Sequence, residues 1–250
     1  MVAYFDLVYR LLLGSVEGRR FMAASAPPGA PTAHSYLTAA DMEALFSFLD
    51  LSGGDVVLDL GCGYGEIAIA VHRRTGADVI GIEASRRALV EARRRFAAAK
   101  VERHVQGVPA NLSRVPAVAQ RARAAYEIDA LMFVPSHWAI YAALLRRMGP
   151  GSRLFATTLE FGAGDHERTR RRLLDSGISV EALDDVSDEM MLVSELRRRT
   201  ALGLLRSGGV GLRGRLAMLF IVVEETTIGY LRRRGLVRRW RMLVSRAPGG

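Results

Sequence analysis

The stretch VVLDLGCGYGE, residues 56–66, places three glycines within five positions directly after an apolar run. This pattern is typical of a buried strand that turns tightly into a helix, because glycine adopts backbone conformations that other residues avoid. A ligand at such a turn lies against bare backbone, at the carboxyl end of the strand, where open α/β sheets bind their ligands. Asp59 lies inside the run and is a candidate contact for that ligand.

Two classes of ligand that use glycine-rich loops fit these residues poorly. Dinucleotide folds use the spacing G-x-G-x-x-G and bring the pyrophosphate to the helix amides. Their third glycine falls on Glu66, whose carboxylate opposes a pyrophosphate. The phosphate loop of NTPases ends in G-K-[ST], and no such sequence follows here. The loop therefore disfavours both of these ligands.

Residues 59–65, DLGCGYG, resemble the D-x-G-x-G-x-G signature of class I S-adenosylmethionine (SAM) dependent methyltransferases. The resemblance covers residues 40–160, with Glu83 at the end of the next predicted strand and a turn at 147–151 similar to the family's L-x-P-G-G. It implies that SAM is the cofactor and S-adenosylhomocysteine the product. It also implies that Asp59 helps to hold the methionyl ammonium and that Glu83 accepts from the ribose hydroxyls.

The resemblance further implies a set of cofactor contacts along the strand ends. The predicted contacts are Asp59, Gly61, Cys62, Gly63, Gly65, Glu83, Ala84, Val108, Pro109, Phe133 and Val134. The chain departs from the family pattern after the third strand, where many members carry an acid that binds the adenine amino group. A backbone carbonyl, Gln106 or Asn111 is left to take its place.

The residues after the fourth and fifth predicted strands bear on the methyl acceptor. FVPSHW lacks the N-P-P-Y pattern typical of base methylation, and the single cysteine, Cys62, leaves no catalytic cysteine pair, so both signals disfavour nucleic acid. His137 either packs at a helix start or acts as a base, because imidazole titrates near neutral pH. Glu160 is a second candidate. His34 and Tyr36 are further candidates in an N-terminal segment expected to fold over the site.

Strand and helix patterns alternate from residue 56 and predict a parallel sheet built from βαβ units. The predicted strands are 56–60, 78–83, 101–108, 128–134, 153–160, 179–183 and 236–245. The predicted helices are 2–13, one capped by Thr38 that ends at Leu49, 65–74, one capped by Ser85 that ends at Ala99, 137–148, 165–176, 187–206 and 213–234. Apolar runs without strict alternation indicate strands buried on both faces.

The expected fold class is α/β, Rossmann-like and doubly wound, with a mostly parallel seven-stranded sheet and helices on both faces. Residues 1–50 are expected to form an N-terminal helical cap and residues 51–164 the SAM-binding core. Residues 165–250 are expected to complete the same domain, with a helical insertion before the last strand. Such additions resemble the lids of small-molecule methyltransferases, which close a dry pocket.

Composition and charge bound the class of protein. The chain is 50% hydrophobic and 24% charged, which indicates a globular protein. A net charge of +9 is compatible with a nucleic-acid or phosphate partner, yet the arginines are spread over many segments, as on solvated helix faces. The single cysteine fits a reducing cytoplasm. No apolar run is long enough to span a bilayer, and no metal-binding cluster is evident.

These observations predict a SAM-dependent methyltransferase that acts on a small molecule, a secondary metabolite or lipid-like compound, as a cytoplasmic monomer or homodimer. Three alternatives stay open. An RNA or protein methyltransferase would use the basic surface, with strongly salt-dependent binding. A SAM-fold protein without methyl transfer would serve as a cyclase or binding module. A phosphorylated substrate such as a prenyl diphosphate would be held by arginines.

Overall fold

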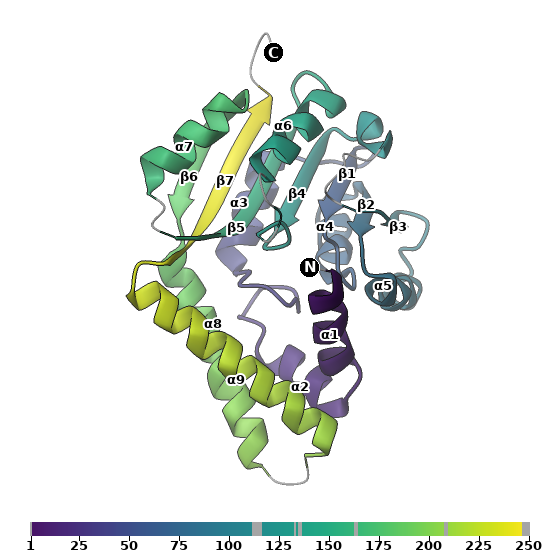
Figure 1. The fold of residues 1–250 in the computed structure, drawn as a ribbon. Coiled ribbons are helices and arrows are strands. Elements are labelled where there is room, and N and C mark those ends of the chain that lie inside the picture. Colours follow the sequence, from purple (N-terminus) through teal and green to yellow (C-terminus); the bar gives the residue numbers. More distant parts are fainter. Residues whose placement is uncertain are drawn as a thin grey trace.

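The computed structural model describes residues 2–111, 117–132, 134, 137–162, 165–207 and 210–246, with side chains from residue 6 onward. Figure 1 shows a central sheet with helices packed on both faces and a separate group of helices beyond one edge. None of the helices in these ranges combines the length and apolar character that a membrane crossing requires.

Within the described residues the sheet has seven strands in the order β3-β2-β1-β4-β5-β7-β6. The strands are β1 (Val56–Leu60), β2 (Asp78–Glu83), β3 (Val105–Pro109), β4 (Ala124–Ile128), β5 (Arg153–Phe161), β6 (Ile178–Asp185) and β7 (Val237–Arg246). Neighbours from β3 to β5 pair in parallel, whereas β7 is antiparallel to β5 and β6. The order reverses between β1 and β4, and such a reversal opens a ligand crevice at the carboxyl edge. The predicted fold class is confirmed.

The helices of the described residues form three groups. One sheet face is covered by α3 (Ala39–Leu49), α4 (Glu66–Thr75) and α5 (Arg86–Ala98). The other is covered by the 3-10 helix η1 (Ala117–Arg121), α6 (His137–Met148) and α7 (His166–Asp175). The third group, here named the lid, consists of α1 (Val2–Leu13), α2 (Val16–Ala24), α8 (Ser187–Arg206) and α9 (Leu212–Arg233). The lid has its own apolar core, which includes Leu12, Phe21, Ala201 and Met218.

Two predicted helix caps are present. The Thr38 hydroxyl accepts from the Asp41 amide at 3.1 Å, and the Asp41 carboxylate accepts from the Thr38 amide at 3.1 Å, which together form a capping box for α3. The Ser85 hydroxyl accepts from the Ala88 amide at 3.2 Å at the start of α5. Each cap satisfies amides that the first helical turn leaves without partners, so both helix starts are fixed by local sequence.

The fourth strand lies earlier than predicted: β4 is Ala124–Ile128, so the prediction of 128–134 is wrong. Asp129 has φ of 53°, which ends the strand one residue after Ile128. The Glu127 carboxylate accepts from the amides of Ala130 and Leu131 and folds the chain into a turn there. Glu127 is a buried acid inside the strand, so the strand does not stand out in the sequence as an apolar run. The apolar residues Leu131 and Val134, which follow it, are buried in a loop instead.

Two further differences concern the N-terminal half. The third strand is shorter than the predicted 101–108, because Lys100 has φ of 59° and residues 102–104 form a turn. The predicted cap segment 1–50 divides between two layers. Helices α1 and α2 join the lid, whereas Leu45 and Phe48 of α3 pack in the core against the sheet.

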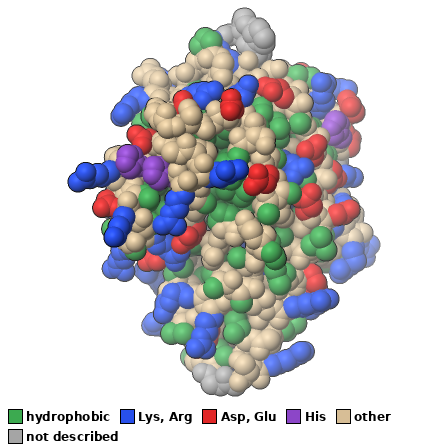
Figure 2. All heavy atoms as spheres, turned by 180° about the vertical axis from the view of Figure 1, so that it is seen from behind, with side chains coloured by type: hydrophobic (Ala, Val, Ile, Leu, Met, Phe, Trp, Pro, Cys, Tyr) green, Lys and Arg blue, Asp and Glu red, His purple; other side chains and the backbone are tan. Residues whose placement is uncertain are grey.

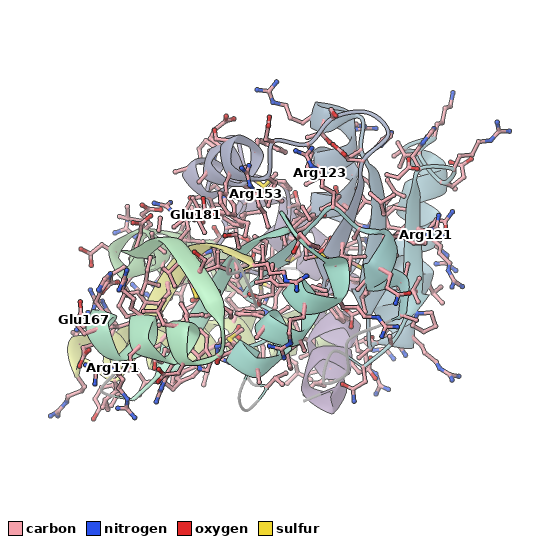
Figure 3. All side chains as sticks on the ribbon, turned by 90° about the horizontal axis from the view of Figure 1, so that it is seen from above. Arg121, Arg123, Arg153, Glu167, Arg171 and Glu181 are labelled. Atoms are coloured by element: carbon pink, nitrogen blue, oxygen red, sulfur yellow. The ribbon has the colours of Figure 1, made fainter. Side chains whose placement is uncertain are left out.

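The sequence pattern predicts arginines on solvated helix faces, but some of them are hydrogen-bonded to the backbone or buried. Figure 2 shows basic side chains scattered among acidic ones rather than gathered in one patch on that face. Arg123 and Arg153, labelled in Figure 3, donate to the carbonyls of Asp50 and Phe48 at 2.8 Å each, at the edge of the sheet where β4 and β5 begin. Two others are buried, with exposed fractions of 3% for Arg197 and 0% for Arg239.

Candidate functional site

The glycine loop turns the chain from β1 into α4 through three left-handed residues. Gly61, Gly63 and Gly65 have φ of 82°, 53° and 83°, values that side-chain-bearing residues rarely adopt. A Cβ on Gly65 would overlap the Phe96 ring of α5, and one on Gly63 would lie 2.9 Å from the Tyr9 hydroxyl. The loop therefore keeps its backbone bare on the side that faces the lid and packs closely on the side that faces α5.

Glu83 connects this loop to the start of α5. Its carboxylate accepts from the Gly63 amide at 3.0 Å and from the Ser85 amide at 2.7 Å. Burial raises its pKa, and these backbone hydrogen bonds oppose that shift. A carboxylate oxygen has two lone pairs, so each still has capacity to accept from a diol at the carboxyl edge of β2.

Asp59 is the second acid at this edge and is 2% exposed. Its Oδ2 has no hydrogen-bond partner among the described residues. Burial raises its pKa to about 7, while the nearby Tyr126 hydroxyl acts in the opposite direction. A buried carboxylate oxygen without a partner is costly, and a bound ammonium group would satisfy it.

The remaining predicted cofactor contacts lie around these two acids. In the sheet register Val108 lies opposite Ile82 and Pro109 opposite Glu83, and Ala84 is half-buried beside them. Cys62 and Val134 are buried. Cys62 packs against Gly81, where a Cβ would lie 2.6 Å from its sulfur. Phe133 lies outside the described residues.

Helix α1, which belongs to the N-terminal segment predicted as a helical cap, covers the loop. The Ser85 hydroxyl donates to Asp6 of α1. The Tyr9 ring packs edge-on against Tyr64 of the glycine loop, with centroids 6.0 Å apart. Tyr9 is buried, and Glu83 and Asp59 add to the burial effect that raises its pKa. The lid thus closes over the same acids that line the sheet edge.

A small pocket, with a cavity volume of about 50 Å³, lies between the lid and the ends of β4 and β5. Its apolar wall includes Met132, Leu159, Phe161 and Ile228. Its polar wall includes His34, Tyr36, Asp129, Arg197 and Glu224. Arg197 of the pocket wall also acts on the buried Tyr64 phenol of the glycine loop, where, after Arg95, it helps to offset the burial that raises the pKa of Tyr64.

A buried ion pair organises the polar wall. The Arg197 guanidinium of α8 donates to Glu225 of α9, whose exposed fraction is 2%. The Tyr36 hydroxyl donates to the other Glu225 oxygen at 3.2 Å. The Arg197 guanidinium also lies 5.6 Å from the centroid of the Tyr36 ring. One arginine therefore fixes a carboxylate and a phenol together at the pocket.

His34 is held in one tautomer by the same arginine. Its Nδ1 lies 2.9 Å from Arg197 Nη2, and because guanidinium only donates, Nδ1 carries no proton. Its Nε2 then bears the proton and lies 3.8 Å from Glu224 Oε1. Burial first and Arg197 second lower the pKa of His34, so the ring is neutral. The lone pair of the neutral ring, on Nδ1, already accepts from Arg197.

Tyr36 is anchored from the opposite side by a second buried ionic group. Its amide donates to Asp129 Oδ2 at 3.0 Å. Arg239 of β7 donates to Asp129 Oδ1 at 2.9 Å and to Asp41 of α3 at 3.0 Å. The sequence prediction missed this group because its members come from α3, the turn after β4, and β7.

The structure separates the four predicted catalytic residues. His34 and Tyr36 line the pocket together. On β5, Leu159 and Phe161 face the pocket, so the alternate residue Glu160 faces α6 and α7.

There the Glu160 carboxylate accepts from Thr169 at 2.7 Å and from the Trp240 indole at 2.9 Å, and Arg172 pairs with it at 2.6 Å. His137, whose pKa is lowered by burial, is on the same side, with Nδ1 3.2 Å from the Val134 carbonyl. Its Nε2 is buried without a hydrogen-bond partner in the described residues. In the part of the chain that the structure describes, no three His, Cys, Asp or Glu side chains are placed to hold a metal ion.

The fold and the glycine-loop edge agree with comparisons to known proteins. A family model described as a methyltransferase domain matches residues 57–151. Methyltransferase GfsG of Streptomyces halstedii is 33% identical over 112 residues, which cover 45% of this chain and 40% of that protein. The 27-O-demethylrifamycin SV methyltransferase of Amycolatopsis mediterranei is 30% identical, with 45% of this chain and 41% of that protein covered. The chain thus spans less than half the length of these two relatives.

Solved structures share the fold at low sequence identity. The geranyl diphosphate C-methyltransferase of Streptomyces coelicolor A3(2) has a TM-score of 0.64 at 19% identity, over 84% of this chain and 79% of that one. Residues 57–151 thus match a methyltransferase domain, and the chain shares the fold of a methyltransferase that was solved with S-adenosylhomocysteine.

Proposed function

We propose that this protein is a methyltransferase that binds SAM and methylates a small acceptor with an apolar body and one hydroxyl or amine. The observation that carries the proposal is the juxtaposition at the carboxyl edge of the sheet. The unpartnered oxygen of Asp59 and the carboxylate of Glu83 lie toward the carboxyl ends of β1 and β2, and at the carboxyl ends of β4 and β5 lies an apolar pocket with a hydrogen-bonded phenol, Tyr36, in its wall.

The residues at the edge fit SAM by their chemistry. Asp59 binds the methionyl ammonium, which gives its buried oxygen a charged donor. Glu83 accepts from the ribose hydroxyls while it keeps the Gly63 and Ser85 amides. The cofactor supplies a methyl group on a sulfonium, open to in-line displacement. The bare backbone at Gly61 and Gly63 and the helix α1 enclose this edge and exclude water.

The acceptor's proton is handled by Tyr36 and Glu225. The Tyr36 hydroxyl donates its proton to Glu225, so its oxygen is free to accept from the acceptor's O–H or N–H. When the acceptor takes the methyl group that bound SAM would supply, the acceptor proton would pass to Tyr36 Oη. The Tyr36 proton passes to Glu225 Oε2. Burial raises the pKa of Glu225, which favours this transfer.

The pocket supports a small acceptor over a macromolecule. Met132, Leu159 and Ile228 line it with apolar surface, and the lid helices α8 and α9 close over it. On the face that Figure 2 shows, basic side chains are dispersed among acidic ones rather than concentrated along one groove. The buried thiol of Cys62 supports a reducing, cytoplasmic location.

Methyl-labelled SAM tests the proposal directly. The protein is incubated with the labelled cofactor and extract of its native host, and small molecules are separated from RNA and protein. We expect label in the organic-soluble fraction of small molecules, with a product that can be identified by mass. Label in RNA or protein instead would overturn the choice of acceptor. Bound SAM without label transfer to any fraction would overturn methyl transfer itself.

A further inference from the structure

The outer face of α9 carries a row of exposed apolar side chains, interrupted by Thr227. Leu212, Leu216, Leu219, Val223 and Tyr230 recur at intervals of four, three and seven residues, so they lie along one side of the helix. Their exposed fractions are 76%, 51%, 51%, 65% and 51%. Figure 1 shows α9 crossing the outside of α8, with this length of helix at the surface of the lid.

The charges on α9 are divided between its two faces. Its exposed residues are the apolar row, two threonines, and Arg213, Arg215 and Arg233, with no acid among them. The two acids, Glu224 and Glu225, turn inward to the pocket and Arg197. The outer face is therefore apolar along its middle and cationic at both ends.

This distribution favours an anionic lipid surface over a second copy of the chain. Two α9 helices packed antiparallel would place Arg213 and Arg215 against Arg233 of the other copy, and parallel packing would place like on like. In both arrangements the arginines of the two copies would lie against one another, beside an apolar row that the packing removes from water. Phosphate headgroups instead accept from arginine, while leucine and valine side chains enter the boundary between headgroups and acyl chains.

We propose that α9 docks the protein on the surface of an anionic bilayer. The helix lies in the plane of the interface, with Leu216, Leu219 and Val223 inserted and the arginines on the lipid phosphates. The opposite face of the same helix lines the pocket through Glu224 and Ile228. Docking thus places the acceptor pocket one helix diameter from the lipid, which suits an apolar acceptor taken from the bilayer. The docking itself does not depend on the proposed methyl transfer.

Sedimentation with vesicles tests the docking. The full chain is mixed with vesicles of phosphatidylglycerol and phosphatidylcholine in equal parts, or of phosphatidylcholine alone. We expect at least about tenfold stronger binding to the anionic vesicles, weakened by salt. Leu219→Glu with Val223→Glu should reduce that binding at least about tenfold, because the row can no longer insert. Val90→Glu with Leu174→Glu adds the same charge at exposed positions of α5 and α7 and should change binding by less than about twofold.

Two further readouts decide between occupants and guard against misfolding. A wild-type dimer in light scattering that Leu219→Glu with Val223→Glu converts to a monomer would identify a second copy as the occupant and overturn the proposal. Equal loss of vesicle binding in both double variants, or no wild-type binding to anionic vesicles, would also overturn it. If the α9 double variant melts differently from wild type, Arg213→Gln with Arg233→Gln replaces it, with the same expected loss and a weaker dependence on salt.

Discussion

The glycine loop with Glu83 and the pocket with Tyr36 both lie at the carboxyl ends of the strands, but they are built from different interactions. At the edge, Glu83 binds backbone amides of residues 63 and 85, and the shape comes from glycine turns. At the pocket, Tyr36 is held by Glu225 and Asp129, which are themselves held by Arg197 and Arg239. One region is specified by local sequence, whereas the other depends on charge pairs between distant segments.

Of the substitutions that test the two regions, the largest effect is expected at Tyr36 in the pocket. Tyr36→Phe keeps the ring in the pocket and removes the hydroxyl that faces the acceptor. We expect turnover to fall by about 10²- to 10⁴-fold, the usual loss when an acid–base group is removed, with SAM affinity little changed. Steady-state kinetics and calorimetry measure the two effects. Wild-type turnover in this variant would remove Tyr36 from the mechanism.

The buried pair behind Tyr36 is the next test. Arg197→Met leaves Glu225 buried without its cation, which should lower the free energy of unfolding by about 3–5 kcal/mol. Denaturant unfolding measures the loss. Replacing both residues, Arg197→Met with Glu225→Leu, should recover much of the stability while turnover stays low. No loss in the single variant would show that the pair does not organise the pocket.

At the glycine-loop edge, Glu83→Gln should weaken SAM binding by about tenfold to a hundredfold, because a charged acceptor of the ribose hydroxyls is lost. The amide is isosteric and retains one acceptor oxygen, so it keeps one of the two backbone hydrogen bonds of Glu83 and loses the other. Calorimetric titration gives the affinity, and circular dichroism checks the fold. Unchanged affinity would contradict the ribose assignment and make Glu83 a structural acid only.

Asp59 should make SAM binding at the glycine loop depend on pH. Its pKa of about 7 means that it is largely protonated below pH 7. SAM binding should then weaken by about tenfold per pH unit as pH falls from 7. The raised pKa also means that its contribution to stability without cofactor is present at low pH and lost as pH rises through 7. The Asp59→Asn variant should bind SAM weakly at every pH. If its affinity for SAM still changed with pH, the titration would belong to another group.

The smallest effect is expected at His137, which begins α6 and does not line the pocket. His137→Ala should change turnover by less than about threefold, far below the loss expected for a general base. Kinetics of this variant beside Tyr36→Phe rank the two residues in one experiment. A hundredfold slower His137→Ala enzyme with normal SAM affinity would restore the assignment that the sequence favours.

The sequence predicted those parts of the molecule whose causes are local. The caps at Thr38 and Ser85 and the glycine turns follow from nearby residues, and the βαβ pattern led to the confirmed fold class. The fourth strand was misplaced because Glu127 looks like a surface residue until Tyr141 and two amides are seen to bind it.

The buried arginines were unpredictable for the same reason. Arg197 and Arg239 stand in basic runs typical of solvated helix faces. Their partners lie in other segments, 28 and 110 residues away for Glu225 and Asp129. No local pattern distinguishes such an arginine from its exposed neighbours, because its burial is decided by tertiary packing.

The position of β7 between β5 and β6 has a consequence for how the protein emerges from the ribosome. Strand β6 pairs only with β7 in the described sheet, so it has no neighbour until residues beyond 237 are synthesised. Asp129 likewise waits for Arg239, and Tyr36 waits for Asp129 to be fixed. The pocket is thus completed only after β7 has been translated, whereas the glycine loop can form once β1, β2 and α4 have left the exit tunnel. A nascent chain would therefore form its glycine loop before its pocket.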